Sequence, residues 1–308
     1  MMLSYGKVWP TMITPFTNDN KIDYKALEDL IEWYIDHNVD GLFAVCGSSE
    51  MFHLSLRERV NIASFVKEKV CGRVPVIASG HVSESIDDQI EELKRMVDTG
   101  IDALILISNR LARQEDDDNV WKKNTELILK EITDIPLGIY ECPYPYKRLL
   151  SPELLKWCAA TQRFFLMKDT SCDLELLSAK CKAVSGSNLK IYNANTATLV
   201  KSMEFGVAGY MGVMANFHPD LYVSLMDNIQ SKDTKLKKLE SFLSLASLIE
   251  SQCYPISAKY YLRLEGLAIN LDTRSRSLND FTPEMKLQVE YLYNLTMEYR
   301  QEFLALKG

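Results

Sequence analysis

Residues 164–172, FFLMKDTSC, open with four apolar residues and turn polar at Lys168. The apolar part has the length of a strand and shows no alternation of polar and apolar side chains. Such a run is typical of a strand that is covered on both faces, as in a parallel sheet. The ammonium group of Lys168 then either reaches water at the strand end or is kept in the interior for its chemistry.

Seven further apolar runs of strand length occur along the chain, and helix-like segments separate them. Helix start signals include the capping box of Ser55 and Glu58. Eight strand–helix units in order predict an α/β fold, a (β/α)8 TIM barrel. A doubly wound sheet is the alternative, but it calls for a glycine-rich phosphate turn, and the sequence contains no GxGxxG. The seven runs cover residues 8–14, 41–46, 75–79, 103–107, 137–140, 190–193 and 209–214.

The alternation of strands and helices stops after Pro219. Three helix-like segments follow, and no linker rich in Gly, Pro or Ser separates them from the preceding units. We therefore expect a catalytic barrel over residues 1–230 and a three-helix C-terminal extension over residues 231–308 that packs on the barrel.

Composition and charge argue against several classes of function. The chain has 308 residues, 47% hydrophobic and 25% charged, and a net charge of −7, so no basic field favours nucleic acid or an anionic membrane. No apolar run reaches the ~20 residues of a membrane helix. The seven cysteines form no CxxC pair and the four histidines share no ligand-like spacing. We expect a cytoplasmic protein with reduced thiols and no metal site, in which EDDD at residues 115–118 caps a helix.

Polar residues at the strand ends are the candidates for function, because a barrel carries its active site at the C-terminal ends of its strands. Tyr140 and Lys168 end neighbouring strands, which lie ~4.8 Å apart. A lysine that is partly removed from water has a lowered pKa, so its neutral amine can attack a carbonyl and form a Schiff base, while a phenol moves protons. The alternative is that Lys168 forms a salt bridge with Asp169 or Glu141 at the rim.

The chain also resembles a known family. TMITPFTNDNKID, GSSEMFHLSLRER, IYECPYP, LMKDTSCDL and GVAGYMGVMANFHPD are similar, in order and over nearly the whole chain, to motifs of the dihydrodipicolinate synthase / N-acetylneuraminate lyase family of pyruvate-dependent class I aldolases. The resemblance implies Lys168 as the imine-forming lysine and Tyr140 as the proton-relay phenol. It also implies a homotetramer or homodimer that uses no metal and no organic cofactor.

The loop CGSSE, residues 46–50, departs from the family's GTTGE-like loop, which binds the substrate carboxylate. Anchoring on the later motif residues places Gly47 and Ser48 at the hydroxyl pair and Ser49 at the second glycine. Anchoring on Gly47 makes Ser48 and Ser49 the pair. We prefer the first register and expect Ser48, with the backbone of Gly47 and Ser49, to bind the carboxylate. We expect the nearby His53 to be packed.

The segment SNRL, residues 108–111, takes the place of a TPYY-like stretch that carries a relay tyrosine in the synthases. That tyrosine is absent, and Arg110 could bind a carboxylate or phosphate instead. The alternative is a surface or interface arginine. Pro145 stands where the synthases have an arginine for the distal carboxylate of their aldehyde.

Thr170 matches a hydroxyl residue that sugar-acid aldolases of the family use, and Asn195 and Asn216 are polar residues at the same strand ends. These residues favour a polyhydroxylated substrate, although each could also cap a loop. We therefore predict a lyase that binds pyruvate or a 2-oxo acid and cleaves a 2-keto-3-deoxy sugar acid. The alternatives are dihydrodipicolinate synthesis, dehydration or decarboxylation at the same imine, and a non-catalytic 2-oxo-acid-binding paralogue.

Overall fold

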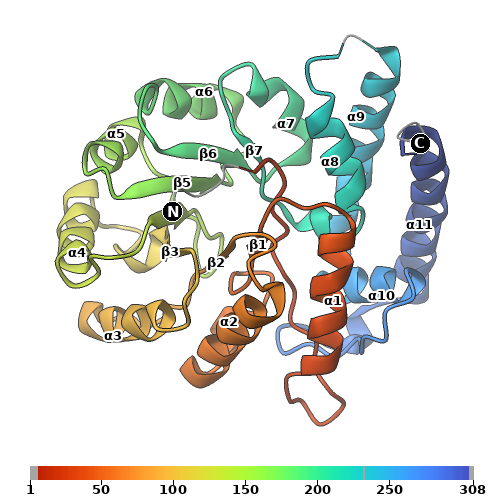
Figure 1. Cartoon of the computed structure of the whole chain (residues 1–308), viewed down its shortest axis with the longest axis horizontal. Coiled ribbons are helices and arrows are strands. Elements are labelled where there is room, and N and C mark those ends of the chain that lie inside the picture. Colours follow the sequence, from red (N-terminus) through yellow and green to blue (C-terminus); the bar gives the residue numbers. More distant parts are fainter. Residues whose placement is uncertain (1–5, 232, 305–308) are drawn as a thin grey trace.

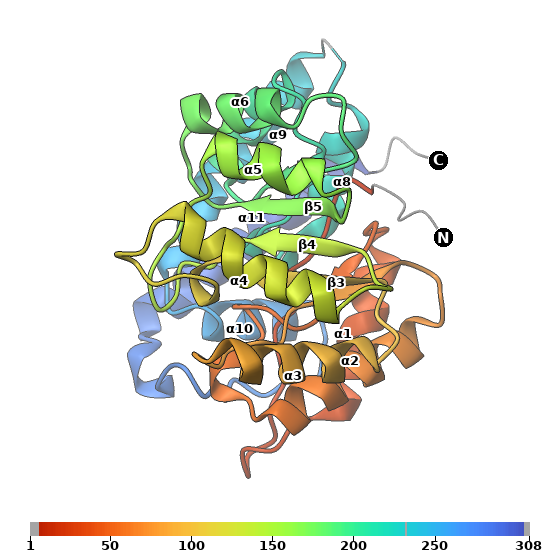
Figure 2. The same ribbon diagram turned by 90° about the vertical axis from the view of Figure 1, so that its left-hand side faces the viewer.

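The computed structural model describes residues 6–231 and 233–304. Within these residues, seven parallel strands form one curled sheet in chain order, with helices on its outside (Figures 1 and 2). The predicted α/β class is confirmed. The strands are β1 (Leu42–Phe43), β2 (Val76–Ala78), β3 (Ala103–Ile107), β4 (Leu137–Tyr140), β5 (Phe164–Asp169), β6 (Lys190–Asn193) and β7 (Gly209–Tyr210).

The first predicted strand, residues 8–14, is wrong as a regular strand. This segment makes only single bridges, from Val8 to Tyr210 of β7 and from Thr11 to Phe43 of β1. Pro10 between the two bridges has no N–H to donate to a ladder, which explains the irregular form. The segment still connects the two ends of the sheet through its backbone. Gly209 permits this, because a Cβ there would lie 2.0 Å from the Lys7 carbonyl oxygen.

The helices outside the sheet begin at the capping residues that the sequence indicates. Ser55 and Glu58 form the predicted capping box of α2, and the Asp117 carboxylate caps α4, as expected for the EDDD run. Short 3-10 turns η1, η2 and η3 follow three strand-end segments. The elements are α1 (Tyr24–Asp36), η1 (Met51–His53), α2 (Leu56–Val70), α3 (Ile86–Val97), η2 (Ser108–Arg110), α4 (Asp118–Glu131), α5 (Pro152–Ala160), α6 (Leu174–Ala183), α7 (Thr196–Met203), η3 (Val213–Asn216) and α8 (Pro219–Asp227).

The C-terminal part of the described chain contains the helices α9, α10 and α11. Helix α9 packs on α7 and α8, and α11 packs on α10 and α8, so this part of the chain covers one side of the sheet structure (Figure 1). The Arg300 guanidinium ties α11 to α8 and α10 through ion pairs with Asp220 and Glu265. The elements are α9 (Thr234–Ala246), η4 (Ser247–Ser251), α10 (Ile256–Leu264), η5 (Leu278–Asp280) and α11 (Pro283–Phe303).

The buried His81 links the end of β2 to β3 and makes stability depend on pH. Its Nε2 accepts the Ile107 N–H at 2.7 Å, so the neutral ring donates from Nδ1 to Gln89 Oε1 at 2.9 Å. Burial lowers the pKa of His81 to about 4, below the unfolded value near 6.5. Between these two pKa values, His81 binds a proton more tightly in the unfolded chain than in the folded chain. We expect about 3 kcal/mol of stability to be lost as the pH falls from 6.5 to 4.

Urea unfolding at pH 7, 5.5 and 4 would measure this loss. The His81→Gln variant keeps an acceptor for the Ile107 N–H but does not titrate, so we expect a flatter pH dependence. An equal acid loss in the two proteins would contradict the role of His81.

Candidate active site

Tyr140 and Lys168 meet at the C-terminal edge of the sheet. They are register partners in the β4–β5 ladder, and the Lys168 Nζ lies 4.5 Å from the centroid of the Tyr140 ring. Each residue is only 4% exposed. The structure therefore holds an amine against the face of a phenol in an enclosed part of the molecule.

Burial of Lys168 favours its neutral form. Burial lowers the pKa of the Lys168 amine, against the opposing effects of Cys46, Cys142 and Glu250. Burial also raises the pKa of the Tyr140 phenol well above its ordinary value, so this phenol keeps its proton until a stronger base forms beside it. An accessible neutral amine beside a protonated phenol is the pairing that imine formation needs.

Lys168 forms no ion pair within residues 6–231 and 233–304, so the alternative of a rim salt bridge is wrong. The two carboxylates that follow the strand ends bind a different lysine. The Lys180 Nζ of α6 lies 2.6 Å from Glu141 Oε1 and 2.6 Å from Asp169 Oδ2, and all three side chains are buried. The sequence analysis missed Lys180, because a lysine on an amphipathic helix ordinarily reaches solvent.

The loop at residues 46–50 places Gly47 and Ser48 beside the phenol. A Cβ on residue 47 would lie 2.9 Å from the Tyr140 Oη, so only glycine allows this approach. The Ser48 hydroxyl is almost buried and donates to the Thr11 Oγ1 at 3.0 Å. Ser48, which we expect to bind the substrate carboxylate, therefore has a hydroxyl that is held in place.

Ser49 has a different role from the predicted one. Its hydroxyl donates to the Cys46 carbonyl oxygen at 2.8 Å and accepts the Cys46 N–H at 2.6 Å. Its N–H interacts with the Cys46 thiol, and the residue is fully buried. The side chain of Ser49 thus makes its hydrogen bonds within the loop, and Gly47 and Ser48 are left to line the candidate site.

Glu50 ties this loop to the C-terminal part of the chain. Its Oε2 accepts the N–H groups of Arg274 at 2.7 Å and Ser275 at 2.6 Å. The Arg274 guanidinium in turn binds Glu58 at 2.8 Å. The segment around residue 275 is thereby held over the strand ends.

A cavity of about 490 Å³ opens beside Tyr140, the partner of Lys168, and it is lined by both parts of the chain. Gly47, Ser48 and Tyr140 come from the strand ends, whereas Tyr254, Ser275 and Arg276 come from the C-terminal segments. The sequence analysis missed these last three, because nothing local in the sequence shows that these segments return to the strand ends. His53 also lines this cavity and is exposed, so the expectation of a packed histidine is wrong.

Tyr254 is fixed in this cavity by a hydrogen-bond network. Its Oη accepts from Asn216 Nδ2 at 3.1 Å and interacts with the Ser48 side chain. Asn216 also donates to the Thr11 carbonyl oxygen at 2.9 Å and accepts from the Tyr34 hydroxyl. Asn216 thus positions a second phenol near Ser48.

Three predicted binding residues lie away from this cavity. The Thr170 hydroxyl donates to the Glu141 carbonyl oxygen at 2.7 Å, and the Asn195 side chain caps α7 by accepting the Thr198 N–H at 3.0 Å. Arg110 lines a separate cavity of about 380 Å³, because the turn η2 directs it away from the strand ends. The structure thus places these side chains in a loop tie, a helix cap and the lining of a second cavity, and their contacts with substrate stay predictions.

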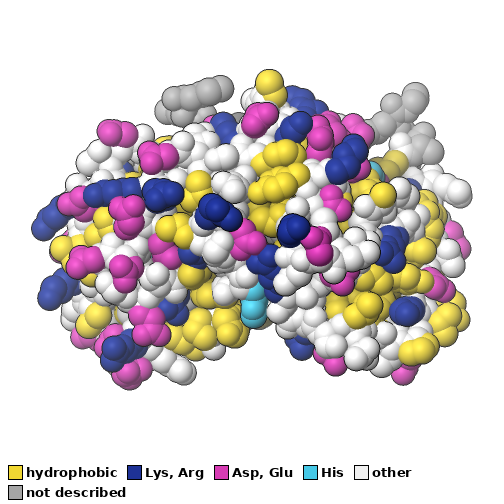
Figure 3. All heavy atoms as spheres, turned by 90° about the horizontal axis from the view of Figure 1, so that it is seen from below, with side chains coloured by type: hydrophobic (Ala, Val, Ile, Leu, Met, Phe, Trp, Pro, Cys, Tyr) yellow, Lys and Arg dark blue, Asp and Glu magenta, His cyan; other side chains and the backbone are white. Residues whose placement is uncertain are grey.

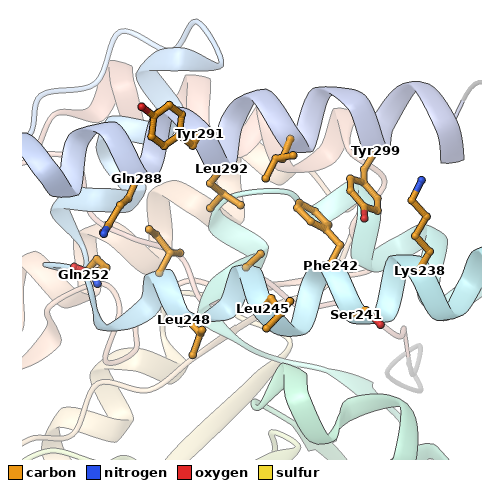
Figure 4. Close-up of a pocket in the computed structure, with 13 residues that line it drawn as sticks. Lys238, Ser241, Phe242, Leu245, Leu248, Gln252, Gln288, Tyr291, Leu292 and Tyr299 are labelled. Carbon is orange, nitrogen blue, oxygen red and sulfur yellow. The ribbon is translucent and has the colours of Figure 1, made fainter.

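A larger cavity, about 730 Å³, is an apolar groove between α9 and α11 (Figure 4). Leu245 of α9, Leu248 of η4 and Tyr291 of α11 are strongly exposed along it. Its single charged lining residue, Lys238, is paired with Glu302. No buried lysine among the described residues lines this groove, so the candidate active site is the cavity beside Tyr140 and its partner Lys168.

The surface charges and the helices bear on other kinds of site. Acidic and basic side chains are mixed over the face that Figure 3 shows, without a field of one sign. No helix in the part of the chain that the structure describes is long and apolar enough to cross a membrane. The same part contains no cluster of three or more His, Cys, Asp or Glu side chains that could hold a metal ion.

A curled parallel sheet that holds a buried, unpaired lysine against a phenol at its C-terminal edge defines a class I aldolase-type lyase. The comparison with known proteins agrees with this class. The profile of the dihydrodipicolinate synthetase family matches residues 4–293, and the chain belongs to this family. The predicted family and the predicted enzyme class are confirmed.

Several synthases are moderately similar to this chain in sequence. The chain is 28% identical to the 4-hydroxy-tetrahydrodipicolinate synthase of Clostridium perfringens (strain ATCC 13124) over 260 residues, which cover 82% of this chain and 86% of that protein. It is 25% identical to the enzyme of that name from Bacillus subtilis (strain 168) over 270 residues, which cover 87% of this chain and 91% of that protein.

Solved structures share the fold over almost the whole chain. YagE, a prophage protein of the dihydrodipicolinic acid synthase family from E. coli K12, solved in complex with pyruvate, matches with a TM-score of 0.86 and 22% identity. The match covers 95% of this chain and 98% of that one. Dihydrodipicolinate synthase DapA-2 from Bacillus anthracis matches with a TM-score of 0.86 and 19% identity, and covers 95% and 99%.

Proposed function

We propose that Lys168 forms an imine with the 2-oxo group of pyruvate or of a larger 2-oxo acid, and that the enzyme reversibly cleaves a 2-keto-3-deoxy sugar acid to pyruvate and an aldehyde. The observation that carries this proposal is the buried Lys168 amine, 4.5 Å from the Tyr140 ring centroid and without a carboxylate partner. The pyruvate complex of YagE gives independent support for the substrate class.

The neutral Lys168 amine attacks the 2-oxo carbon and forms a carbinolamine. Tyr140 gives its proton to the departing hydroxyl, water leaves, and the protonated imine remains. The Tyr140 phenolate then takes the proton of the C4 hydroxyl. The C3–C4 bond breaks, its electron pair moves into the imine to give an enamine, and the aldehyde leaves. Protonation of the enamine and hydrolysis release pyruvate and restore the amine.

Gly47 and Ser48 are the proposed ligands of the substrate carboxylate. Gly47 and Ser48 line the same cavity as Tyr140, and Gly47 approaches its phenol closely, so a carboxylate bound there would place its 2-oxo carbon near Lys168. Charge-assisted hydrogen bonds of this kind are about twice as strong as neutral ones and fix orientation.

The residues in the outer part of the cavity could bind either of two substrate classes. The hydroxyls of Tyr254 and Ser275, together with His53, can hydrogen-bond a polyhydroxylated chain, which favours a sugar acid. Arg276 favours the runner-up, condensation of pyruvate with aspartate semialdehyde. Its guanidinium forms no ion pair or hydrogen bond with any residue that the structure describes, and it could bind a second carboxylate.

Borohydride trapping tests the imine directly. We expect pyruvate plus borohydride to add one reduced pyruvyl group to the protein, detected by mass spectrometry and mapped to Lys168. Release of pyruvate from a panel of 2-keto-3-deoxy sugar acids then tests the preferred reaction. Turnover of pyruvate with aspartate semialdehyde alone would establish the runner-up, and an adduct without any turnover would indicate a binding paralogue. Absence of an adduct would end the proposal.

Two further expectations accompany this function. The Glu50 contacts with Arg274 and Ser275 support a C-terminal extension that completes the site and does not act as an independent unit. The expected homotetramer or homodimer stays a prediction, and light scattering of the purified protein would measure it.

A further inference from the structure

The buried triad of Lys180, Glu141 and Asp169 has no part in the chemistry described above. The Lys180 Nζ bridges the two carboxylates at 2.6 Å each, and all three residues are completely buried. Removing three charged groups from water is costly, and such clusters are rarely justified by stability alone. A specific contribution to the neighbouring site would account for their presence.

The triad and the catalytic pair lie on opposite faces of the same two strand ends. Glu141 directly follows Tyr140, and Asp169 directly follows Lys168. Successive side chains of a strand point to opposite faces, so Tyr140 and Lys168 face the interior while both carboxylates face α6. The Glu141 N–H donates to the Lys168 carbonyl oxygen at 3.3 Å, so the two strand ends stay paired up to the triad.

Glu141 also holds the loops that leave these strands. Its Oε1 accepts the Leu150 N–H at 2.7 Å, and its Oε2 accepts the Thr170 N–H at 3.1 Å. Asp169 Oδ1 accepts the Ser171 N–H at 2.9 Å. With both carboxylates engaged in this way, their positions relative to Lys168 are fixed.

Titratable groups lie on both sides of the strand end that carries Lys168. On the interior side, Cys46, Tyr140, Cys142 and Glu250 face the amine. On the outer side are Glu141, Asp169 and Lys180, with Cys181 beside Asp169. Without Lys180, two buried carboxylates would stand behind the nucleophile and favour its charged, unreactive form.

We propose that Lys180 is a positioning residue of the active site: it binds the Glu141 and Asp169 carboxylates on the outer face of the β4 and β5 ends and thereby keeps Lys168 without a counter-ion. It sets the pH at which the Lys168 amine becomes nucleophilic. This inference rests on the proposed imine function of Lys168.

The pH dependence of adduct formation tests the inference. Wild type, Lys180→Met and Glu141→Gln are incubated with pyruvate from pH 5 to 9 and trapped with borohydride, and the pH of half-maximal adduct rate is determined. A unit charge about 10 Å away, at an effective dielectric constant near 20, shifts a pKa by roughly one unit. We therefore expect a shift of about one pH unit upward in Lys180→Met and downward in Glu141→Gln.

Opposite shifts cannot come from damage to the fold, which lowers the rate at every pH without moving the midpoint. Lys147→Met, which removes an exposed lysine near Thr170, is the matched control and should leave the profile unchanged. If Lys180→Met does not fold, the uncharged triple variant Lys180→Met, Glu141→Gln, Asp169→Asn replaces it, and its midpoint should fall below that of wild type.

The outcomes separate the two proposals. No adduct in wild type at any pH contradicts the imine function itself. An adduct in wild type together with an unshifted midpoint in the folded variants overturns the role of Lys180 and leaves the imine function intact.

Discussion

Replacing Lys168 by alanine is expected to abolish the trapped pyruvate adduct and to reduce turnover on the order of 10⁴-fold or more, as removal of a covalent nucleophile does. Two nearby lysines are not expected to substitute, because Lys180 is held by Glu141 and Asp169 and Lys147 is exposed outside the cavity. The fold should persist, since the buried amine has no ion-pair partner among the described residues to leave behind.

Two comparisons make this test specific. Lys168→Arg keeps a cation but cannot form an imine, so it should be as inactive as Lys168→Ala. Lys147→Ala removes a nearby exposed lysine and should retain full adduct formation. In wild type the adduct rate should rise with pH at values below the ordinary lysine range, because burial lowers the pKa of Lys168. An undiminished adduct in Lys168→Ala would assign the chemistry elsewhere.

Replacing Tyr140 by phenylalanine is expected to lower kcat by about 10²–10⁴-fold, the usual contribution of a positioned acid–base group. The ring itself is retained, with its edge contact to Phe43 at 5.8 Å and its place below the Lys168 amine. Pyruvate should therefore still bind, with KM changed less than kcat. The adduct should form slowly, because carbinolamine dehydration loses its proton donor.

Steady-state kinetics and single-turnover trapping would measure both effects. Tyr144→Phe is a suitable control, because the Tyr144 side chain lines the same cavity but is 57% exposed. It should stay within a few-fold of wild type. A Tyr140→Phe variant with wild-type kcat would show that another group moves the protons, and the Tyr254 phenol beside Ser48 would be the first to examine.

Features that depend on local sequence were predicted well. Strands β3, β4 and β6 have the predicted bounds, and the capping box of Ser55 and Glu58 is present. The adjacency of Tyr140 and Lys168 followed from strand order alone, because consecutive strands of a parallel α/β fold are neighbours. The regular strand expected over residues 8–14 failed at Pro10, whose missing N–H outweighs the apolar pattern.

Side-chain direction in the loops was predicted poorly. Arg110, Thr170 and Asn195 all follow strand ends, yet a 3-10 turn, a backbone acceptor and a helix N-cap direct them away from the cavity. Polar side chains near a loop have many local partners, and the choice among them depends on backbone dihedral angles that a residue pattern does not specify.

The sequence by itself determined the order of strands and helices, the lysine and the phenol at adjacent strand ends, and the family. Local periodicity and caps suffice for the strands, the helices and the two strand-end residues, since each is encoded within a few residues, and the family followed from the resemblance of five motifs. Only the tertiary structure decided that Tyr254 and Arg276 complete the cavity and that Lys180 takes the carboxylates beside Lys168. These contacts join segments far apart in the chain, and burial makes them energetically important only once the fold has removed the groups from water.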